Sequence, residues 1–178
     1  GLIAIKIKKG DELRWVSATS GQSHIIIATA NGQAIRFEGK KVRTMGRTAS
    51  GVRAIRLKSE DYVIGMASLS KADQAGKTQI LTLSENGYGK RSQLKEYKVQ
   101  GRGGSGIKTA KITAKTGKLV SMNILTESEL EDDLLMISKK GQVIRTHLKD
   151  ISVLGRSTQG VRIMRLTAED SVASVAII

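Results

Sequence analysis

The sequence contains no cysteine and no proline, and aromatic residues make up only 3% of its 178 positions. The absence of cysteine excludes disulfides, thiolate zinc sites and cysteine nucleophiles. The scarcity of aromatic residues argues against a single-strand or RNA binder that stacks bases on aromatic side chains. No apolar run approaches the roughly 20 residues that a membrane span needs. The first ten residues alternate apolar and basic side chains, which is unlike the apolar segment of a signal peptide.

Basic residues, in contrast, are abundant. The chain has 30 Lys and Arg residues against 16 Asp and Glu residues, which gives a formal net charge of +14. A charge of this size on a short chain predicts a polyanionic partner, such as nucleic acid or an anionic membrane surface. The hydrophobic fraction of 39% is sufficient for a packed core.

The chain is built from repeats of one unit. A short phrase opens each unit, reading GLIAIKI at 1–7, GVRAIRL at 51–57, GIKTAKI at 106–112 and GVRIMRL at 160–166. The units therefore span 1–50, 51–105 and 106–159, and 160–178 completes or starts a further blade of a single partial domain. Equivalent positions recur in register, among them Gly32, Gly87 and Gly141. A period near 50 residues is typical of propeller-like arrays.

Each unit has the pattern of β structure. The opening phrase alternates apolar and basic positions, and short apolar runs at 25–29, 80–83 and 134–137 predict strands buried on both faces. Asn31-Gly32, Asn86-Gly87 and Lys140-Gly141 predict a hairpin in each unit, with a type I′ turn. We therefore predict an all-β, propeller-like array of four-stranded blades, three to four in number, that forms an open arc. The alternative is a β-sandwich with fortuitous internal similarity.

Basic residues recur at fixed places in the units, namely the strand after the hairpin, the segment that follows it, and the opening phrase. Such a pattern would create a continuous basic rim, suited to a polyanion that bends around the protein. The alternative is that lysine and arginine only solvate a β surface. The predicted DNA-binding residues are Arg36, Lys40, Lys41, Arg43, Arg47, Arg53, Lys90, Arg91, Lys95, Lys98, Arg102, Lys108, Arg145, Lys149, Arg156 and Arg162.

Other motifs are weak. Residues 101–106 spell G-x-G-x-x-G, but a dinucleotide fingerprint needs a helix after it, and the following GIKTAKIT is strand-like. His24 and His147 are not equivalent in the repeat and have no metal-ligand spacing. We therefore expect no catalytic residue, metal site or cofactor in this chain. We interpret the few aromatic residues as core or blade-contact residues: Trp15, Phe37, Tyr62, Tyr88 and Tyr97.

Several phrases, including GDEL, NGYGKR, EYKVQGRGGSGI and GRTASGVRAIRL, resemble the C-terminal domain of the A subunit of DNA gyrase. The resemblance implies a β-pinwheel, in which blades exchange strands and duplex DNA wraps around a basic perimeter. It further implies a cytoplasmic, nucleoid-associated protein whose partners are DNA, the gyrase B subunit, and the rest of the gyrase A subunit. ATP and Mg²⁺ would be used elsewhere in that enzyme, and no membrane partner is expected.

The family's hallmark box, Q-R-R-G-G-K-G, is absent from this sequence. The most similar segment is a box-like loop that resembles the corresponding loop of a later blade: Gln100, Gly101, Arg102, Gly103, Gly104, Ser105 and Gly106. The alternatives left open are the related C-terminal domain of the topoisomerase IV A subunit, a propeller-like protein-interaction scaffold, and a basic β protein associated with RNA or the ribosome.

Overall fold

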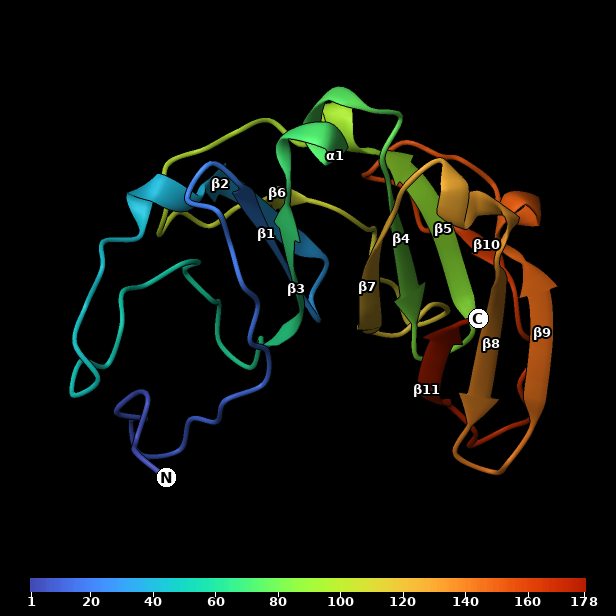
Figure 1. Cartoon of the computed structure of the whole chain (residues 1–178). Coiled ribbons are helices and arrows are strands. Elements are labelled where there is room, and N and C mark those ends of the chain that lie inside the picture. Colours follow the sequence, from blue (N-terminus) through green and yellow to red (C-terminus); the bar gives the residue numbers. More distant parts are fainter.

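The computed structural model describes residues 1–178 and contains three small antiparallel sheets that lie side by side (Figure 1). We call them blades 1, 2 and 3. Blade 1 has the order β3 (Val63–Leu69), β1 (His24–Thr29), β2 (Gln33–Glu38), β6 (Ile107–Lys108). Blade 2 has the order β10 (Val161–Arg162), β5 (Tyr88–Gln93), β4 (Gln79–Ser84), β7 (Leu119–Leu125). Blade 3 has the order β11 (Val172–Ile177), β8 (Asp133–Ser138), β9 (Val143–His147).

Helical structure is limited to short pieces between the strands. They are one helix, α1 (Lys71–Ala75), and four 3₁₀ turns: η1 (Gly39–Lys41), η2 (Leu94–Glu96), η3 (Ser128–Glu131) and η4 (Leu148–Asp150). No helix is long and apolar enough to cross a bilayer. The predicted all-β, propeller-like fold is confirmed, although only two of the three sheets have four strands.

The apolar runs form the inner strands β1, β4 and β8, each of which pairs with a neighbour on both sides. Their isoleucine, leucine and threonine side chains suit a pleated surface that is covered from both faces. All six residues of β4 are buried, as expected for the sheet in the middle of the array.

Each inner strand continues into a hairpin, as predicted, but the predicted turn type is wrong. The loop has three residues in the first two hairpins and four in the third, and only its glycine has a positive φ, at 77° for Gly32, 77° for Gly87 and 84° for Gly141. A type I′ turn needs a positive φ at both central residues. The glycine N–H instead closes a turn on the carbonyl of the residue three positions earlier, at 3.0 Å in all three hairpins.

The strands of one blade come from successive repeat units. In blade 1, β1 and β2 belong to the unit 1–50, β3 to the unit 51–105, and β6 to the unit 106–159. Blade 2 repeats this arrangement one unit later, with β10 supplied from 160–178. No unit completes a blade alone, so the blades are linked by exchanged strands.

The hairpin glycine is the point at which a later unit joins the blade. The Gly32 carbonyl accepts hydrogen bonds from the N–H groups of Thr109 (2.8 Å) and Ala110 (3.3 Å). The Gly87 carbonyl accepts from Ile163 (2.8 Å) and Met164 (3.1 Å). A Cβ at Gly87 would lie 2.4 Å from the Met164 carbonyl oxygen, so only glycine permits this approach.

The opening phrases form less strand than predicted. Only two residues of the third phrase and two of the fourth are in strands, as β6 and β10, and the phrases at 1–7 and 51–57 contain none. Whether a phrase forms a strand depends on whether the chain contains a strand that can pair with it. Each phrase pairs with a hairpin strand two units earlier, and the first two phrases have no such strand in this chain.

The core lies at the junctions between blades. One cluster joins Ile26 of β1 to Ile80 of β4 and Met122 of β7, and another joins Leu81 of β4 to Leu134 of β8. Three aromatic residues, Phe37, Tyr88 and Tyr97, are buried as predicted. Two others, Trp15 and Tyr62, are 36% and 49% exposed, so the prediction is wrong for them. They line a pocket with Val63 and Met66 on a side of blade 1 that no sheet covers.

The hairpin glycines provide a test of the joint between units. Gly87→Ala and Gly141→Ala each place a side chain at a positive φ, which costs about 1–2 kcal/mol. Gly141 has nothing within 4 Å of an added Cβ, whereas Gly87 meets the backbone of residue 164. We expect Gly87→Ala to lower the free energy of unfolding by about 1–3 kcal/mol more than Gly141→Ala. Urea unfolding measures both values, and equal losses would contradict the proposed joint.

Candidate nucleic-acid interface

Most of the predicted DNA-binding side chains lie at the surface. Those that are exposed are Lys40, Lys41, Arg43, Arg47, Arg53, Lys95, Lys98, Lys108, Arg145, Lys149 and Arg162, and those that are partly buried are Arg102 and Arg156. Most of them follow the second hairpin strand of each blade or lie in an opening phrase, and Arg145 lies within β9. The arrangement places cations at equivalent positions of successive blades.

The 3₁₀ turns η1, η2 and η4 each expose one equivalent lysine. Lys40 lies 3.4 Å from a Glu38 carboxylate oxygen, and Lys149 lies 3.0 Å from a Glu131 carboxylate oxygen. The hydrogen bond with Glu131 raises the pKa of Lys149. Lys95 has no carboxylate partner, so its charge is the least compensated of the three.

Three of the predicted residues are buried instead. Arg36 is 8% exposed and Arg91 is 7% exposed, and burial lowers the pKa of both guanidinium groups. Arg36 donates to the Tyr97 carbonyl (3.3 Å), and Arg91 donates to the carbonyls of Lys149 and Ile151 (2.7 Å each). Both arginines therefore tie one blade to the turn that follows the next hairpin, and the structure does not place them at the rim.

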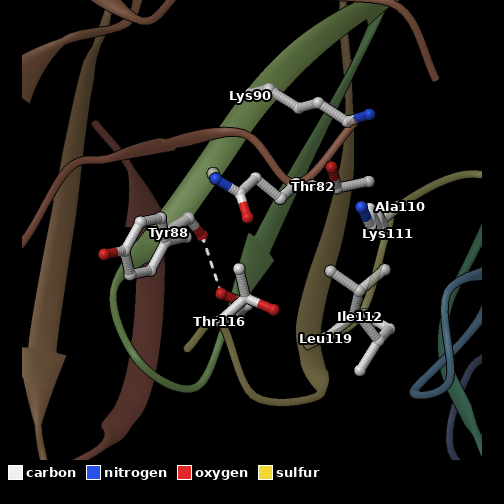
Figure 2. Close-up of a pocket in the computed structure, with 11 residues that line it drawn as sticks. Thr82, Tyr88, Lys90, Ala110, Lys111, Ile112, Thr116 and Leu119 are labelled. Carbon is white, nitrogen blue, oxygen red and sulfur yellow. Dashed lines mark hydrogen bonds between the residues drawn. The ribbon is translucent and has the colours of Figure 1, made fainter. Parts of the chain in front are cut away.

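Lys90 is the third buried residue, at 1% exposure on β5. Its ammonium donates to the carbonyls of Gly155 (2.7 Å), Arg156 (2.7 Å) and Thr158 (3.1 Å), and to the Thr158 hydroxyl (3.1 Å). Desolvation lowers the pKa of Lys90 to about 8, with Glu96 acting in the opposite direction. Figure 2 shows the side chain in the wall of a small pocket that Tyr88 and Lys111 also line.

Arg145 occupies the position equivalent to Arg36 and Arg91 in blade 3, but its partners differ. Its guanidinium lies 2.5 Å from one Asp133 carboxylate oxygen, and His147 lies 2.5 Å from the other. The hydrogen bond from Arg145 is the main cause that lowers the pKa of Asp133. Arg145 is exposed but paired, so it offers less free charge to a polyanion than its sequence position suggests.

The three arginines beside glycines share a second position in the repeat. Arg102 donates to the carbonyls of Lys41 (3.2 Å) and Arg53, and Arg156 donates to the Lys108 carbonyl (2.8 Å). Arg53 and Lys108 are equivalent, since each is the third residue of the opening phrase in the same unit as the arginine that binds it. Arg47 is exposed and makes no such bond. The guanidinium group of Arg102 or Arg156 thus holds its own loop against the opening phrase of the same unit, and its remaining N–H groups stay free to donate.

The box-like loop lies along blade 1. Gln100 donates its N–H to the Arg36 carbonyl (2.7 Å), and Gly103 donates its N–H to the Ala54 carbonyl (2.7 Å). Gly106 has a φ of +74°, and a Cβ there would lie 2.5 Å from the Ala34 carbonyl oxygen. The segment leads into strand β6 and not into a helix, so the geometry of a dinucleotide site is absent.

One surface cluster was not expected from the sequence. Arg162 donates to the Tyr88 hydroxyl (2.7 Å) and lies 5.3 Å from the ring centre, and Lys115 lies 5.5 Å from the same ring. Lys115 lies outside the repeated opening phrases, so the recurrent basic positions did not predict it. No group of three or more His, Asp or Glu side chains is placed to hold a metal ion.

Comparison with known proteins gives a consistent result. The chain matches the family described as "DNA gyrase C-terminal domain, beta-propeller" over residues 1–20, 23–70, 78–126 and 132–178. It is 43% identical to the A subunit of DNA gyrase from Staphylococcus epidermidis over 176 residues, which is 99% of this chain and 19% of that protein. It is 42% identical to the A subunit of DNA gyrase from Deinococcus deserti, over 98% of this chain and 21% of that protein.

Two solved structures are similar in fold. A structure of a DNA gyrase A C-terminal domain gives a TM-score of 0.81 at 27% identity, covering 99% of this chain and 58% of that one. The C-terminal domain of a DNA topoisomerase IV gives a TM-score of 0.87 at 21% identity, covering 98% and 52%, which shows the fold alone. The chain spans about a fifth of the length of the curated relatives it matches. It belongs to the family of DNA gyrase A C-terminal domains, and its sheets form the β-pinwheel of that family.

Proposed function

We propose that this chain binds duplex DNA through the phosphate backbone, without reading sequence, and bends the duplex along its basic edge. The observation that carries the proposal is the exposed lysine at the equivalent turn of three successive blades, namely Lys40, Lys95 and Lys149. Equivalent positions of neighbouring blades lie along one edge, so these lysines define a path and not an isolated patch. Lysines that recur along an edge, with no helix or strand that would enter a DNA groove, are suited to contacts with the phosphate backbone of DNA.

The arrangement of the three blades side by side supports the proposed bend (Figure 1). Bending a duplex of 20–30 base pairs costs on the order of 1–6 kcal/mol, which contacts along one curved path can offset. The gyrase family supports a specific setting for this activity. The chain would act as the DNA-wrapping domain of the gyrase A subunit, and its partners in ATP-dependent negative supercoiling would be the B subunit and the remainder of gyrase A. It would contribute no catalytic group of its own.

Salt dependence tests the electrostatic mechanism. If about six phosphates are contacted, the logarithm of the association constant should fall with the logarithm of salt concentration at a slope near −5. Fluorescence anisotropy of a labelled duplex at several salt concentrations measures the slope, and energy transfer between labels at the two duplex ends reports bending. A slope near zero would refute the phosphate mechanism. Tighter binding to structured RNA would favour the RNA alternative, and absence of binding to either nucleic acid would favour a protein-interaction scaffold.

The equivalent lysines provide a matched pair of variants. Lys95 has no acidic partner, whereas Lys149 is neutralised in part by Glu131 at 3.0 Å. We expect Lys95→Ala to weaken binding to all duplex sequences alike and to reduce the salt slope by about 1. Lys149→Ala should have the smaller effect, because the Lys149 charge is already partly compensated and contributes less to the attraction of phosphate.

The comparison is made in the same anisotropy titration with both variants at matched salt. If Lys149→Ala weakens binding as much as Lys95→Ala, local pairing does not decide which cations contact DNA. If neither variant changes the affinity, the edge defined by the 3₁₀ turns is not the DNA path.

A further inference from the structure

The loop Gly155–Gly160 is organised around a buried cation from the neighbouring unit. Lys90 lies on β5, and four oxygen atoms of this loop surround its ammonium at 2.7–3.1 Å. Three of the four are backbone carbonyls, belonging to Gly155, Arg156 and Thr158. The loop residues Ser157, Thr158 and Gln159 are exposed. The carbonyls therefore point inward from a loop that faces solvent.

The orientation of the carbonyls fixes that of the amide groups. In a trans peptide the C=O and the following N–H point in opposite directions. With the carbonyls of Arg156 and Thr158 directed at Lys90, the N–H groups of Ser157 and Gln159 point away from it. Neither N–H has an acceptor within the protein. The N–H of Arg156, which follows the Gly155 carbonyl, is not free, because it donates to a Glu96 carboxylate oxygen at 3.0 Å.

Two free amide groups beside an arginine have the chemistry of an anion site. Backbone N–H groups turned to one side of a loop can bind phosphate oxygens together. The N–H of Thr158, between the two free amides, donates to the Gly155 carbonyl at 3.2 Å and takes no part. The Arg156 guanidinium commits one nitrogen to the Lys108 carbonyl and keeps its other donors. Glu96 lies on the inner side, where its charge acts on Lys90. The loop thus has donors outside and acceptors inside.

We propose that the Ser157 and Gln159 amides, with the Arg156 guanidinium, bind a phosphate of the DNA backbone, and that Lys90 is the positioning residue that orients them. The proposal rests on the DNA-binding function proposed above and assigns a particular contact within it. Lys90 cannot touch DNA, because it is 1% exposed. It acts by keeping the peptide groups of the loop turned outward.

The equivalent loop of blade 1 lacks this arrangement. Ile35 takes the place of Lys90, and it lies 3.8 Å from where a Cβ of Gly104 would be. The Gly103 N–H, which is equivalent to that of Ser157, is used internally by the Ala54 carbonyl at 2.7 Å. Blade 3 has Ile144 at the position of Lys90. The proposed site is therefore particular to the loop 155–160.

Amide chemical shifts provide a direct test. On titrating the ¹⁵N-labelled chain with a DNA duplex, we expect the amide signals of Ser157 and Gln159 to shift at saturation. Lys90→Met, which keeps the length of the side chain, should abolish these two shifts and weaken DNA binding about threefold to tenfold, the loss of a phosphate contact. Lys90→Ile places the residue of the sister repeats in the same position and should behave alike.

The control is Lys139→Met, which removes one positive charge from an exposed side chain at the β8–β9 hairpin and should leave the Ser157 and Gln159 shifts in place. Undiminished shifts in a folded Lys90→Met or Lys90→Ile variant would overturn the role of Lys90. Shifts elsewhere on the rim of the unaltered chain, with none at Ser157 and Gln159, would overturn the site whether or not the variants fold.

A titration with inorganic phosphate separates this proposal from the general one. If the unaltered chain fails to bind DNA, the proposed function fails. Phosphate-induced shifts at Ser157 and Gln159 that depend on Lys90 would still support the anion site. DNA binding without any change at these two amides would leave the function standing and refute the site.

Discussion

The hydrogen bonds that a hairpin glycine carbonyl accepts from a phrase two units later hold the array together. In an ordinary repeat protein each unit contacts only its neighbours, and stability is a sum of local terms. Here Gly32 in the first unit binds Thr109 and Ala110 in the third, so contacts extend past the adjacent unit. Because no unit completes a sheet alone, each four-stranded blade takes its strands from three consecutive units. The positions of the surface cations depend on the same hydrogen bonds, because these bonds place the opening phrase and the loop that precedes the phrase.

The repeat and its hairpins could be predicted because they depend on short-range signals. Alternating side chains, an apolar run and a glycine at a turn lie within one unit, and together they predicted an all-β array with a hairpin in each unit. Strand exchange could not be predicted from these residues, because a segment becomes a strand only where a second strand is available to pair with it. The phrase GVRAIRL at 51–57 resembles the one that forms β10, yet only the latter meets a hairpin strand of this chain. Trp15 and Tyr62 are exposed for the same reason, since no sheet covers their side of blade 1.

The candidate site was predicted less well because recurrence has two causes. Arg36 and Arg91 recur because each reaches carbonyls of the next unit, which is a structural requirement with the same sequence signature as a binding role. For Lys90, the third buried residue, one signal in the sequence indicates burial. Ile35, Lys90 and Ile144 share a position, and two isoleucines there indicate an inward-facing side chain. A lysine among them is better interpreted as a buried cation that needs acceptors than as a surface contact.

The formal charge of +14 consequently overstates what a DNA duplex would meet at the surface. Arg36, Lys90 and Arg91 direct their charges into the protein, and in blade 3 Arg145 and Lys149 have carboxylate partners. The uncompensated cations belong mainly to the first two units, including Lys41, Arg43, Arg47, Lys95 and Lys98. Long-range attraction depends on net exposed charge, while register depends on fixed donors. Under the proposed function, blades 1 and 2 would therefore attract the duplex, and the loop at 155–160 beside blade 2 would fix its position as it passes toward blade 3.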